Sequence, residues 1–314
     1  MNRRRRGARL RRGRALLDAA LVGVALGWSA LAACAPDANS IARGAAHASV
    51  VDDQQRALSE APPARRIVAL APHLTDIVVA LGASSSLVAV DRHSDATQLP
   101  GSIARIASYP VIDPERLLAL RPDLILVWGE GLSASALSRL EALGLRVFVS
   151  RPRALDDVAS SIERIGALVG VSSRAASIAS QFRESLLSLT ERYARTPAVP
   201  VFIQIWETPL ITLGSRSVMT DALIRCGVRN VFAAPDAGSQ RVSLESVLAA
   251  APRLVISTVA GATDSRWRQL GVVGDSPGAA RFVSMVDPAL ERPSPRVLDS
   301  VASLCEAIDA ALPR

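Results

Sequence analysis

Short apolar runs alternate with stretches of helical periodicity along the chain from residue 65 onward. Residues 65–72 form an aliphatic run closed by proline, an apolar-periodic stretch follows to Leu81-Gly82, and residues 87–90 are again a short apolar run. In the second half, a strand-like run at 199–206 precedes a helical stretch at 217–225. This repeated order of elements predicts βα units and a parallel sheet in each half.

A sharper internal repeat relates residues 112–126 to residues 242–256. In both stretches a capping residue, Asp113 or Ser243, is followed two positions later by glutamate, then by a Leu-Ala pair and, seven positions after the glutamate, by proline. Asp113 and Ser243 are typical N-cap residues, and Pro114 occupies the favoured first helical position. Each stretch therefore predicts one short helix that leads into one buried strand.

Two stretches between the halves, residues 155–169 and 174–195, show helical spacing of apolar residues. A helix over the 22 residues of the second stretch is about 33 Å long, which is enough to span two lobes. The predicted fold class is α/β, with two parallel-sheet α/β lobes joined by a long rigid helix.

The N-terminal segment has the three parts of a secretory signal peptide. Residues 1–33 hold eight arginines and one acidic residue, followed by an apolar run and small residues that end in Leu31-Ala32-Ala33-Cys34. This last motif resembles the bacterial lipoprotein box, which predicts lipidation of Cys34. Ordinary cleavage, with Cys34 discarded or incidental, is the alternative. Residues 34–64 lack sustained periodicity and are typical of a flexible tether.

Composition and charge narrow the class of protein. The chain has 314 residues, of which 49% are apolar and 21% charged, so it can bury one large core or two smaller ones. The formal net charge of +7 equals the charge of the leader alone, eight arginines less one aspartate, so the remaining residues sum to zero. A neutral body disfavours nucleic-acid binding.

The sequence predicts an exported, periplasmic monomer that contacts the membrane only through a lipid anchor or a membrane partner. The predicted organisation is a signal peptide at 1–33, a tether at 34–64, an N-terminal lobe at 65–152, connecting helices at 153–196 and a C-terminal lobe at 197–314.

Besides Cys34, the chain has two further cysteines, Cys226 and Cys305. In an oxidising compartment an even pair favours a disulfide, and two buried free thiols are the alternative.

The mature body resembles the bacterial substrate-binding proteins with a rigid helical interdomain connector, which deliver ligands to ABC importers, and within them the cobalamin-binding branch. The residues that carry this resemblance are Pro72 with Asp76, 112–128, 202–206, Cys226-Gly227 with 230–232, the Glu245 repeat unit and 291–296. The resemblance implies that Cys226 and Cys305 form the disulfide of that branch. It also implies that Glu115 and Glu245, one on each lobe, pair with arginines of a permease dimer that works with an ATPase. Stabilisation of a helix N-terminus is the simpler role for both glutamates.

Ligand contacts are expected in the loops after the strands. Tyr109 and Trp128 fall in such loops of the first lobe and Trp206 in the second, and a large flat ligand needs rigid aromatic surface. Core packing is the alternative role for the tryptophans. His73 and His93 also fall in loops after strands and are candidate ligand contacts, but their spacing is not that of a metal site.

The resemblance implies two further contacts: His93 aligns with a ligand-contacting aromatic residue, and Arg292 matches an arginine near the polar side chains of the corrin. An ion pair with Glu291 is the alternative for Arg292. The chain departs from the family pattern where Gly238-Ser239-Gln240 replaces an expected tryptophan and where 287–290 lack an aromatic residue. The resemblance implies cobalamin as the ligand, carried rather than kept as a cofactor, but these departures leave the exact ligand open. Other corrinoids, haem with Tyr109 on the iron, and a ferric siderophore remain open.

One motif favours an enzyme, because residues 274–278 match the G-x-S-x-G pattern of serine hydrolases. Such a hydrolase needs a histidine downstream of Ser276, and none follows His93. Pro277 would also remove the backbone N–H that stabilises the oxyanion in those enzymes. We expect no catalytic residues and no resident cofactor.

Overall fold

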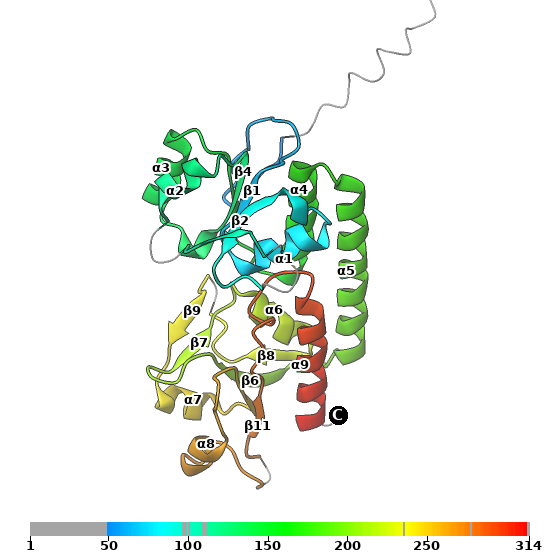
Figure 1. The fold of residues 1–314 in the computed structure, drawn as a ribbon. Coiled ribbons are helices and arrows are strands. Elements are labelled where there is room, and N and C mark those ends of the chain that lie inside the picture. The colour runs from blue at the N-terminus through cyan, green and yellow to red at the C-terminus, as the bar shows by residue number, and fades with distance from the viewer. Residues whose placement is uncertain are drawn as a thin grey trace, which may run out of the picture. The chain divides into compact units, whose positions relative to one another are not determined.

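The computed structural model describes residues 49–95, 99, 101–108, 112–234, 236–276 and 278–312. Within these residues, two α/β lobes are joined by a pair of long helices (Figure 1). The predicted signal peptide, the lipidation at Cys34 and Tyr109 all lie outside the described residues.

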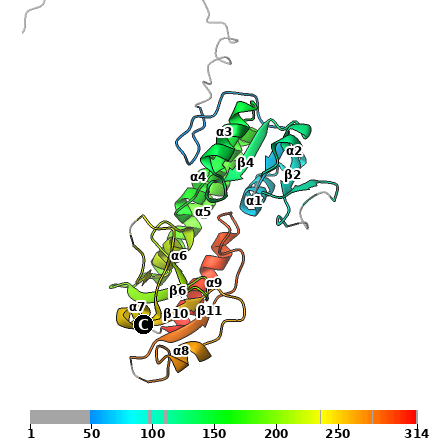
Figure 2. The ribbon, with the colours of Figure 1, turned by 90° about the vertical axis from the view of Figure 1, so that its left-hand side faces the viewer.

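The first lobe is a parallel five-stranded sheet with helices on both faces. Its elements are β1 (Ile67–Ala69), α1 (Pro72–Ala80), η2 (Ser84–Ser86), β2 (Leu87–Asp91), β3 (Ala104–Ile106), α2 (Pro114–Ala119), β4 (Leu124–Trp128), η3 (Gly129–Gly131), α3 (Ala134–Ala142) and β5 (Val147–Ser150). The strand order is β3-β2-β1-β4-β5. Side chains alternate along each strand, so Ile67 and Ala69 pack toward α1 while Val68 packs in the cluster that contains α2 and α3. Figure 2 shows this lobe from the side.

The second lobe repeats this plan around a four-stranded parallel sheet. Its elements are β6 (Val199–Gln204), β7 (Ile211–Leu213), α6 (Val218–Arg225), β8 (Val228–Asn230), β9 (Ser239–Arg241), α7 (Leu244–Ala250), β10 (Leu254–Ser257), α8 (Ser265–Gln269), β11 (Arg281–Ser284) and α9 (Val297–Ala311). The parallel strands have the order β11-β10-β6-β8. Helices α6 and α9 pack on one face and α7 and α8 on the other. An antiparallel ribbon of β7 and β9 is an addition that the sequence pattern did not predict.

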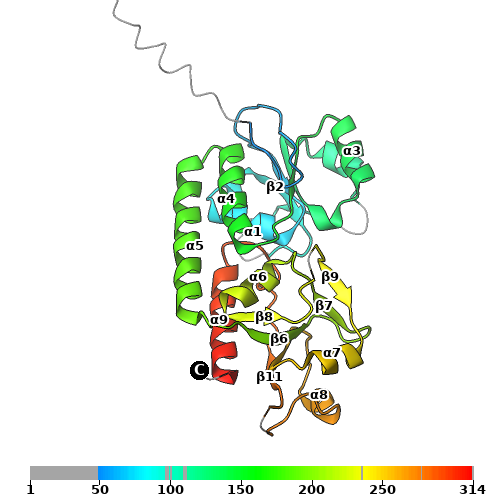
Figure 3. The same cartoon turned by 180° about the vertical axis from the view of Figure 1, so that it is seen from behind.

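Two helices connect the lobes. Helix α4 (Leu155–Val169) has the predicted bounds, and α5 (Ser172–Tyr193) has the predicted 22 residues but begins two positions earlier. Gly170 ends α4 at a φ of 78°, a left-handed conformation that glycine adopts without strain. Helix α5 continues past α4 and lies beside α9, as the view from behind shows (Figure 3).

Apolar packing is continuous from one lobe to the other. A single cluster of buried side chains contains residues of β1 and α1, of the connector and of α6 and α9. Polar contacts also join the connector to the second lobe. The backbone N–H of Leu155 in α4 donates to Asp221 Oδ2 in α6 at 2.9 Å. Arg225 of α6 also pairs with Asp156 of α4 at 2.8 Å. The connector is therefore part of the core of both lobes.

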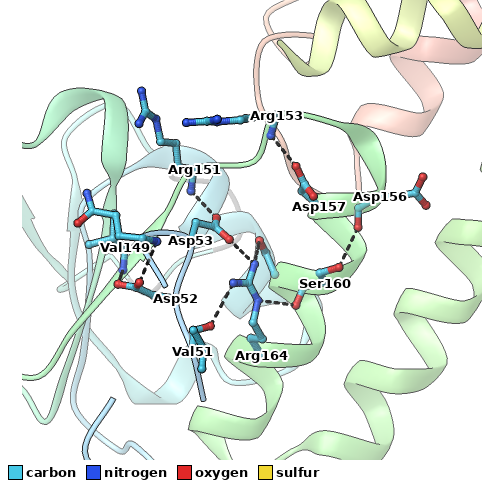
Figure 4. Close-up of polar contacts among 12 residues, drawn as sticks. Val51, Asp52, Asp53, Val149, Arg151, Arg153, Asp156, Asp157, Ser160 and Arg164 are labelled. Atoms are coloured by element: carbon cyan, nitrogen blue, oxygen red, sulfur yellow. Dashed lines mark hydrogen bonds and ion pairs between the residues drawn. The ribbon is translucent and has the colours of Figure 1, made fainter. Parts of the chain in front are cut away.

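The predicted tether at 34–64 is wrong for its second half. Residues 50–58, which we name the N-terminal strap, pack against the first lobe (Figure 4). The carboxylate of Asp52 is fully buried and accepts from the backbone N–H of Val149 in β5 at 3.2 Å. The backbone N–H of Asp53 donates to the Val149 carbonyl at 3.0 Å, and Arg164 of α4 pairs with the Asp53 carboxylate at 2.6 Å. The strap thus covers the free edge of β5, which would otherwise expose unpaired backbone groups.

The structure joins Cys226 and Cys305 in a disulfide. Cys226 ends α6 and Cys305 lies within α9, and both are buried in the core of the second lobe. The disulfide therefore links the two helices on one face of the sheet.

Candidate functional site

A cavity of about 220 Å³ opens in the first lobe at the carboxyl ends of β1, β2 and β4. This is the edge at which open parallel sheets bind ligands. The lining residues are Leu70, Ala71, Pro72, Asp91, His93, Ser108, Ile112, Val127, Trp128, Gly131 and Leu132. A neighbouring cavity of about 240 Å³ shares Ser108, Ile112, Gly131 and Leu132 with it and extends along the start of α3. The first lobe thus presents a mainly apolar hollow with a few polar groups.

Trp128 is the dominant aromatic surface of this hollow. It is the last residue of β4, where the preceding four residues are buried, yet its own side chain is 46% exposed. A Cβ at Gly129 would lie 3.0 Å from Val149 Cγ1, so the glycine lets the chain turn closely over β5 directly after the tryptophan. Core packing is therefore excluded as the role of Trp128.

His93 lines the same cavity and is held by a buried carboxylate. Asp91 Oδ1 accepts from the backbone N–H of His93 at 2.8 Å and lies 3.1 Å from His93 Nδ1. Asp91 Oδ2 accepts from the hydroxyl of Ser108 at 2.6 Å. The imidazole is largely exposed while Asp91 is buried, so the carboxylate fixes the ring at the edge of the cavity. This role of Asp91 was not predicted from the sequence, although a carboxylate directly after the predicted strand at 87–90 is a typical ligand-site position.

His73 occupies a different place from the one predicted. It is the second residue of α1 rather than part of a loop, because Pro72 starts the helix immediately after β1. The side chain is buried, its ring stands edge-on to that of Trp128, and its Nε2 has no hydrogen-bond partner. Burial, with a smaller effect of Arg292, lowers the pKa of His73 to about 3. His73 is therefore a neutral support beneath Trp128 and does not line the cavity.

Trp206 provides exposed aromatic surface on the second lobe. It follows β6, its side chain is 58% exposed, and its Nε1 donates to the carbonyl of Thr208 at 3.0 Å. Trp267, by contrast, is buried against Phe202 and donates from Nε1 to Gln204 at 3.1 Å. Core packing is thus the role of Trp267 and not of Trp206.

Arg292 lies in the segment that brings the second lobe against the first. It is partly buried, forms no ion pair with Glu291 among the described residues, and affects the pKa of His73. Nearby, Arg296 lies 3.7 Å from the carboxylate of Asp95 in the first lobe. Burial raises the pKa of Asp76 in α1, and the positive charge of Arg296 opposes that shift. The lobes therefore meet through charged groups as well as apolar ones, a contact that sequence analysis did not predict.

Glu115 and Glu245 occupy equivalent positions, as the internal repeat predicts. Helix α2 is capped by Asp113, which accepts from the backbone N–H of Glu115 at 3.0 Å. Helix α7 is capped by Ser243, which accepts from the backbone N–H of Ser246 at 3.2 Å. Both glutamates are exposed in the first turns of their helices, and neither forms an ion pair within the part of the chain that the structure describes.

The hydrolase motif lies in an unsuitable place. Gly274 to Ser276 follow α8 and precede β11, whereas a nucleophile elbow joins a strand to a following helix. Asp275 is paired with Arg268 at 3.0 Å. The described residues contain no group of three or more histidine, cysteine or acidic side chains arranged to hold a metal. In the same residues, no helix is long and apolar enough to cross a membrane.

Together, the parallel sheets, the long connector and the exposed tryptophans at strand ends define a two-lobed α/β binding protein with a helical connector. A family model for periplasmic binding proteins matches residues 67–272, and the chain belongs to this family. The vitamin B12-binding protein of Vibrio parahaemolyticus is 31% identical over 249 residues, which cover 79% of this chain and 90% of that protein. The vitamin B12-binding protein of Yersinia pestis is 31% identical over 253 residues, which cover 81% and 89%.

Solved structures of periplasmic binding proteins are also similar to this chain. The crystal structure of the periplasmic vitamin B12-binding protein of Vibrio cholerae is similar with a TM-score of 0.68 and 30% identity, covering 80% of this chain and 99% of that one. A periplasmic haem-binding protein from Pseudomonas aeruginosa is similar with a TM-score of 0.62 and 27% identity, covering 80% and 93%.

Proposed function

We propose that this chain is the exported, non-enzymatic binding protein of an ABC importer and that it captures cobalamin or a related corrinoid between its lobes. The observation that carries the proposal is the exposure of Trp128 and Trp206, one at a strand end of each lobe. Exposed tryptophans are costly to keep in water, and they offer rigid apolar surface to a large planar ligand.

The size of the cavity supports a ligand held by both lobes. Its volume of about 220 Å³ is below the roughly 300–1,000 Å³ that encloses a drug-sized molecule. A corrinoid therefore needs a second wall, which Trp206 supplies. His93, held by Asp91, and Arg292 add polar contacts at the edge of the ligand. Tyr109, which follows β3 in the sequence, is proposed as a further contact.

The names of the relatives support the choice of ligand. The vitamin B12-binding proteins of Vibrio and Yersinia match about four-fifths of this chain, and their matches extend over the cavity and both exposed tryptophans. We further propose that the chain acts in the periplasm, that Cys34 carries a lipid anchor, and that the disulfide between Cys226 and Cys305 forms after export. Glu115 and Glu245 then meet arginines of the permease dimer.

A fluorescence titration with cyanocobalamin tests the ligand proposal. If the leader is removed, the exported chain retains Trp128, Trp206 and Trp267. Corrin binding is expected to quench the two exposed tryptophans and leave the buried Trp267 emission. Trp128→Ala or Trp206→Ala should weaken binding by about 10- to 100-fold, or roughly 1.4–2.7 kcal/mol. Trp128→Phe, which keeps an aromatic face, is the matched control and should lose less. Unchanged affinity in both alanine variants would refute the aromatic site.

A second candidate ligand is haem, favoured by the geometry of His93. A histidine whose Nδ1 faces a carboxylate is arranged like most histidines that ligate metal, because the carboxylate fixes the orientation of the ring. In this case haem should bind with a Soret shift that His93→Ala removes, while cyanocobalamin should not bind. The reverse pattern supports the corrinoid.

A further inference from the structure

Two exposed leucines lie one helical turn beyond Glu115 and Glu245, the glutamates that we propose contact the permease. Leu118 in α2 is 40% exposed and Leu248 in α7 is 45% exposed. Each is three positions after its glutamate, so the glutamate and the leucine are neighbours on one face of the helix. Only eight large apolar side chains are exposed among the described residues, and this pair occupies equivalent places in the internal repeat.

The exposure of the two leucines does not result from poor packing of their helices. The residue just before each of them, Leu117 or Val247, is fully buried and holds the helix on its sheet. The residue after each is alanine, and it is also exposed, so the apolar surface continues past the leucine. The guanidinium of Arg116 donates to the carbonyl of Arg105 at 3.0 Å, and Glu115 is left without an ion pair in the described part of the chain.

We infer that the permease is held at two equivalent contacts, in each of which a leucine enters an apolar site beside the positive charge that meets the glutamate. Glu115 with Leu118 forms one contact and Glu245 with Leu248 the other. This inference rests on the proposed function and deepens it, because it adds the apolar half of the docking surface and requires a permease with a small apolar pocket next to its arginines.

The twofold character of the two patches identifies the kind of partner. One chain that presents the same pair of residues twice fits a homodimer, whose two subunits offer the same site twice. A second copy of this chain fits less well, because it would bring glutamate against glutamate at both contacts. Burial of a leucine in such a site adds affinity, while the charged pair steers and orients the encounter.

Biolayer interferometry of the full, exported chain against the permease–ATPase complex of the same bacterium in nanodiscs tests the inference. Leu118→Gln and Leu248→Gln should each weaken binding about tenfold, and the double variant about 100-fold if the two sites are independent. Leu143→Gln and Leu187→Gln are matched controls, since Leu143 is 42% and Leu187 57% exposed outside both patches. They should change the affinity less than about twofold, as exposed substitutions usually do.

The outcomes separate this inference from the proposed function. Glu115→Gln and Glu245→Gln are measured in parallel. If the glutamate variants lose affinity and the double leucine variant stays within about twofold of the parent chain, the apolar half of the contact is refuted while docking stands. If the glutamate variants bind like the parent chain, the docking role itself is refuted. Self-association of the parent chain that the leucine variants abolish would assign the patches to a second copy and overturn the inference.

Discussion

The ring of Trp128 stands edge-on to the ring of His73, with centroids 6.4 Å apart and an interplanar angle of 83°. Trp128 is half-exposed and His73 is buried, so the histidine fixes the face that the tryptophan presents. Because burial keeps His73 neutral, this support adds no charge beneath an apolar surface. A rigid, uncharged aromatic wall is suited to a flat ligand, since little conformational freedom is lost on binding.

Acid should destabilise the protein through His73. Its pKa is lowered to about 3 in the folded chain, against the ordinary value of 6.5 in the unfolded chain. Between these values the unfolded chain binds a proton that the folded chain does not. The free energy of unfolding therefore falls as the pH drops from about 6.5 toward 3, by up to about 1.4 kcal/mol per pH unit.

Urea denaturation across this pH range measures the effect. His73→Leu removes the titrating group and should flatten the acid side of the stability curve. Asp76→Asn is the opposing control: burial raises the pKa of Asp76, so folding favours its protonation and its removal should steepen the loss. If the free energy of unfolding falls equally with pH in the parent chain and in His73→Leu, His73 is not the cause of the acid sensitivity.

The contact between Leu155 and Asp221 should contribute to the rigidity of the connector. Asp221→Ala leaves the buried N–H of Leu155 without its acceptor, which costs about 1–3 kcal/mol of unfolding free energy. Asp156→Ala removes an exposed partner of Arg225, an arginine that Asp221 also contacts at 3.3 Å, and should cost less than about 1 kcal/mol. Small-angle scattering should also show little compaction of the parent chain on ligand addition, because apolar packing runs through the connector. Equal losses in the two variants, or large compaction, would argue for a hinged connector.

The N-terminal strap should be required for the stability of the first lobe. Asp52→Ala removes a buried carboxylate that accepts from Val149 and pairs with Arg56, and the expected loss is about 3–5 kcal/mol. Glu141→Ala removes the exposed partner of the same arginine, so a change below about 1 kcal/mol is expected. Denaturant midpoints measure both. Indistinguishable midpoints for the two variants would show that the strap is not part of the folded lobe.

The disulfide should add to the stability of the second lobe. It joins residues 79 positions apart, and closure of a loop of this size is worth about 4–5 kcal/mol in the chain-entropy model. The double variant Cys226→Ala with Cys305→Ala should lose about this much, and reduction of the parent chain with dithiothreitol should produce the same shift. Insensitivity to dithiothreitol would indicate free thiols.

The sequence predicted those helices and strand ends that are determined by residues close to them in the chain. The caps Asp113 and Ser243 marked the two short helices, and the 3.6-residue spacing gave α4 its bounds. The exposed tryptophans Trp128 and Trp206 were also predicted as strand-end residues, because each follows a strand-like apolar run.

Apart from the Cys226–Cys305 disulfide, which the resemblance implied, the features that depend on distant contacts were not predicted. The strap resembles a tether in sequence, since Asp52 finds its partner Val149 97 residues away and no local pattern shows this. The contact of Arg296 with Asp95 and the ribbon of β7 with β9 depend in the same way on tertiary packing. His73 was placed in a loop because it follows the strand-like run that ends at Pro72, yet the fixed φ of Pro72 starts a helix immediately after β1.

Isothermal titration calorimetry of the ligand-free exported chain with cyanocobalamin tests the central claim most directly. The account predicts one corrinoid per chain and a negative heat-capacity change, because apolar surface of both lobes is buried on binding. The absence of heat with cyanocobalamin, together with saturable binding of haem or a ferric hydroxamate to the same preparation, would contradict it.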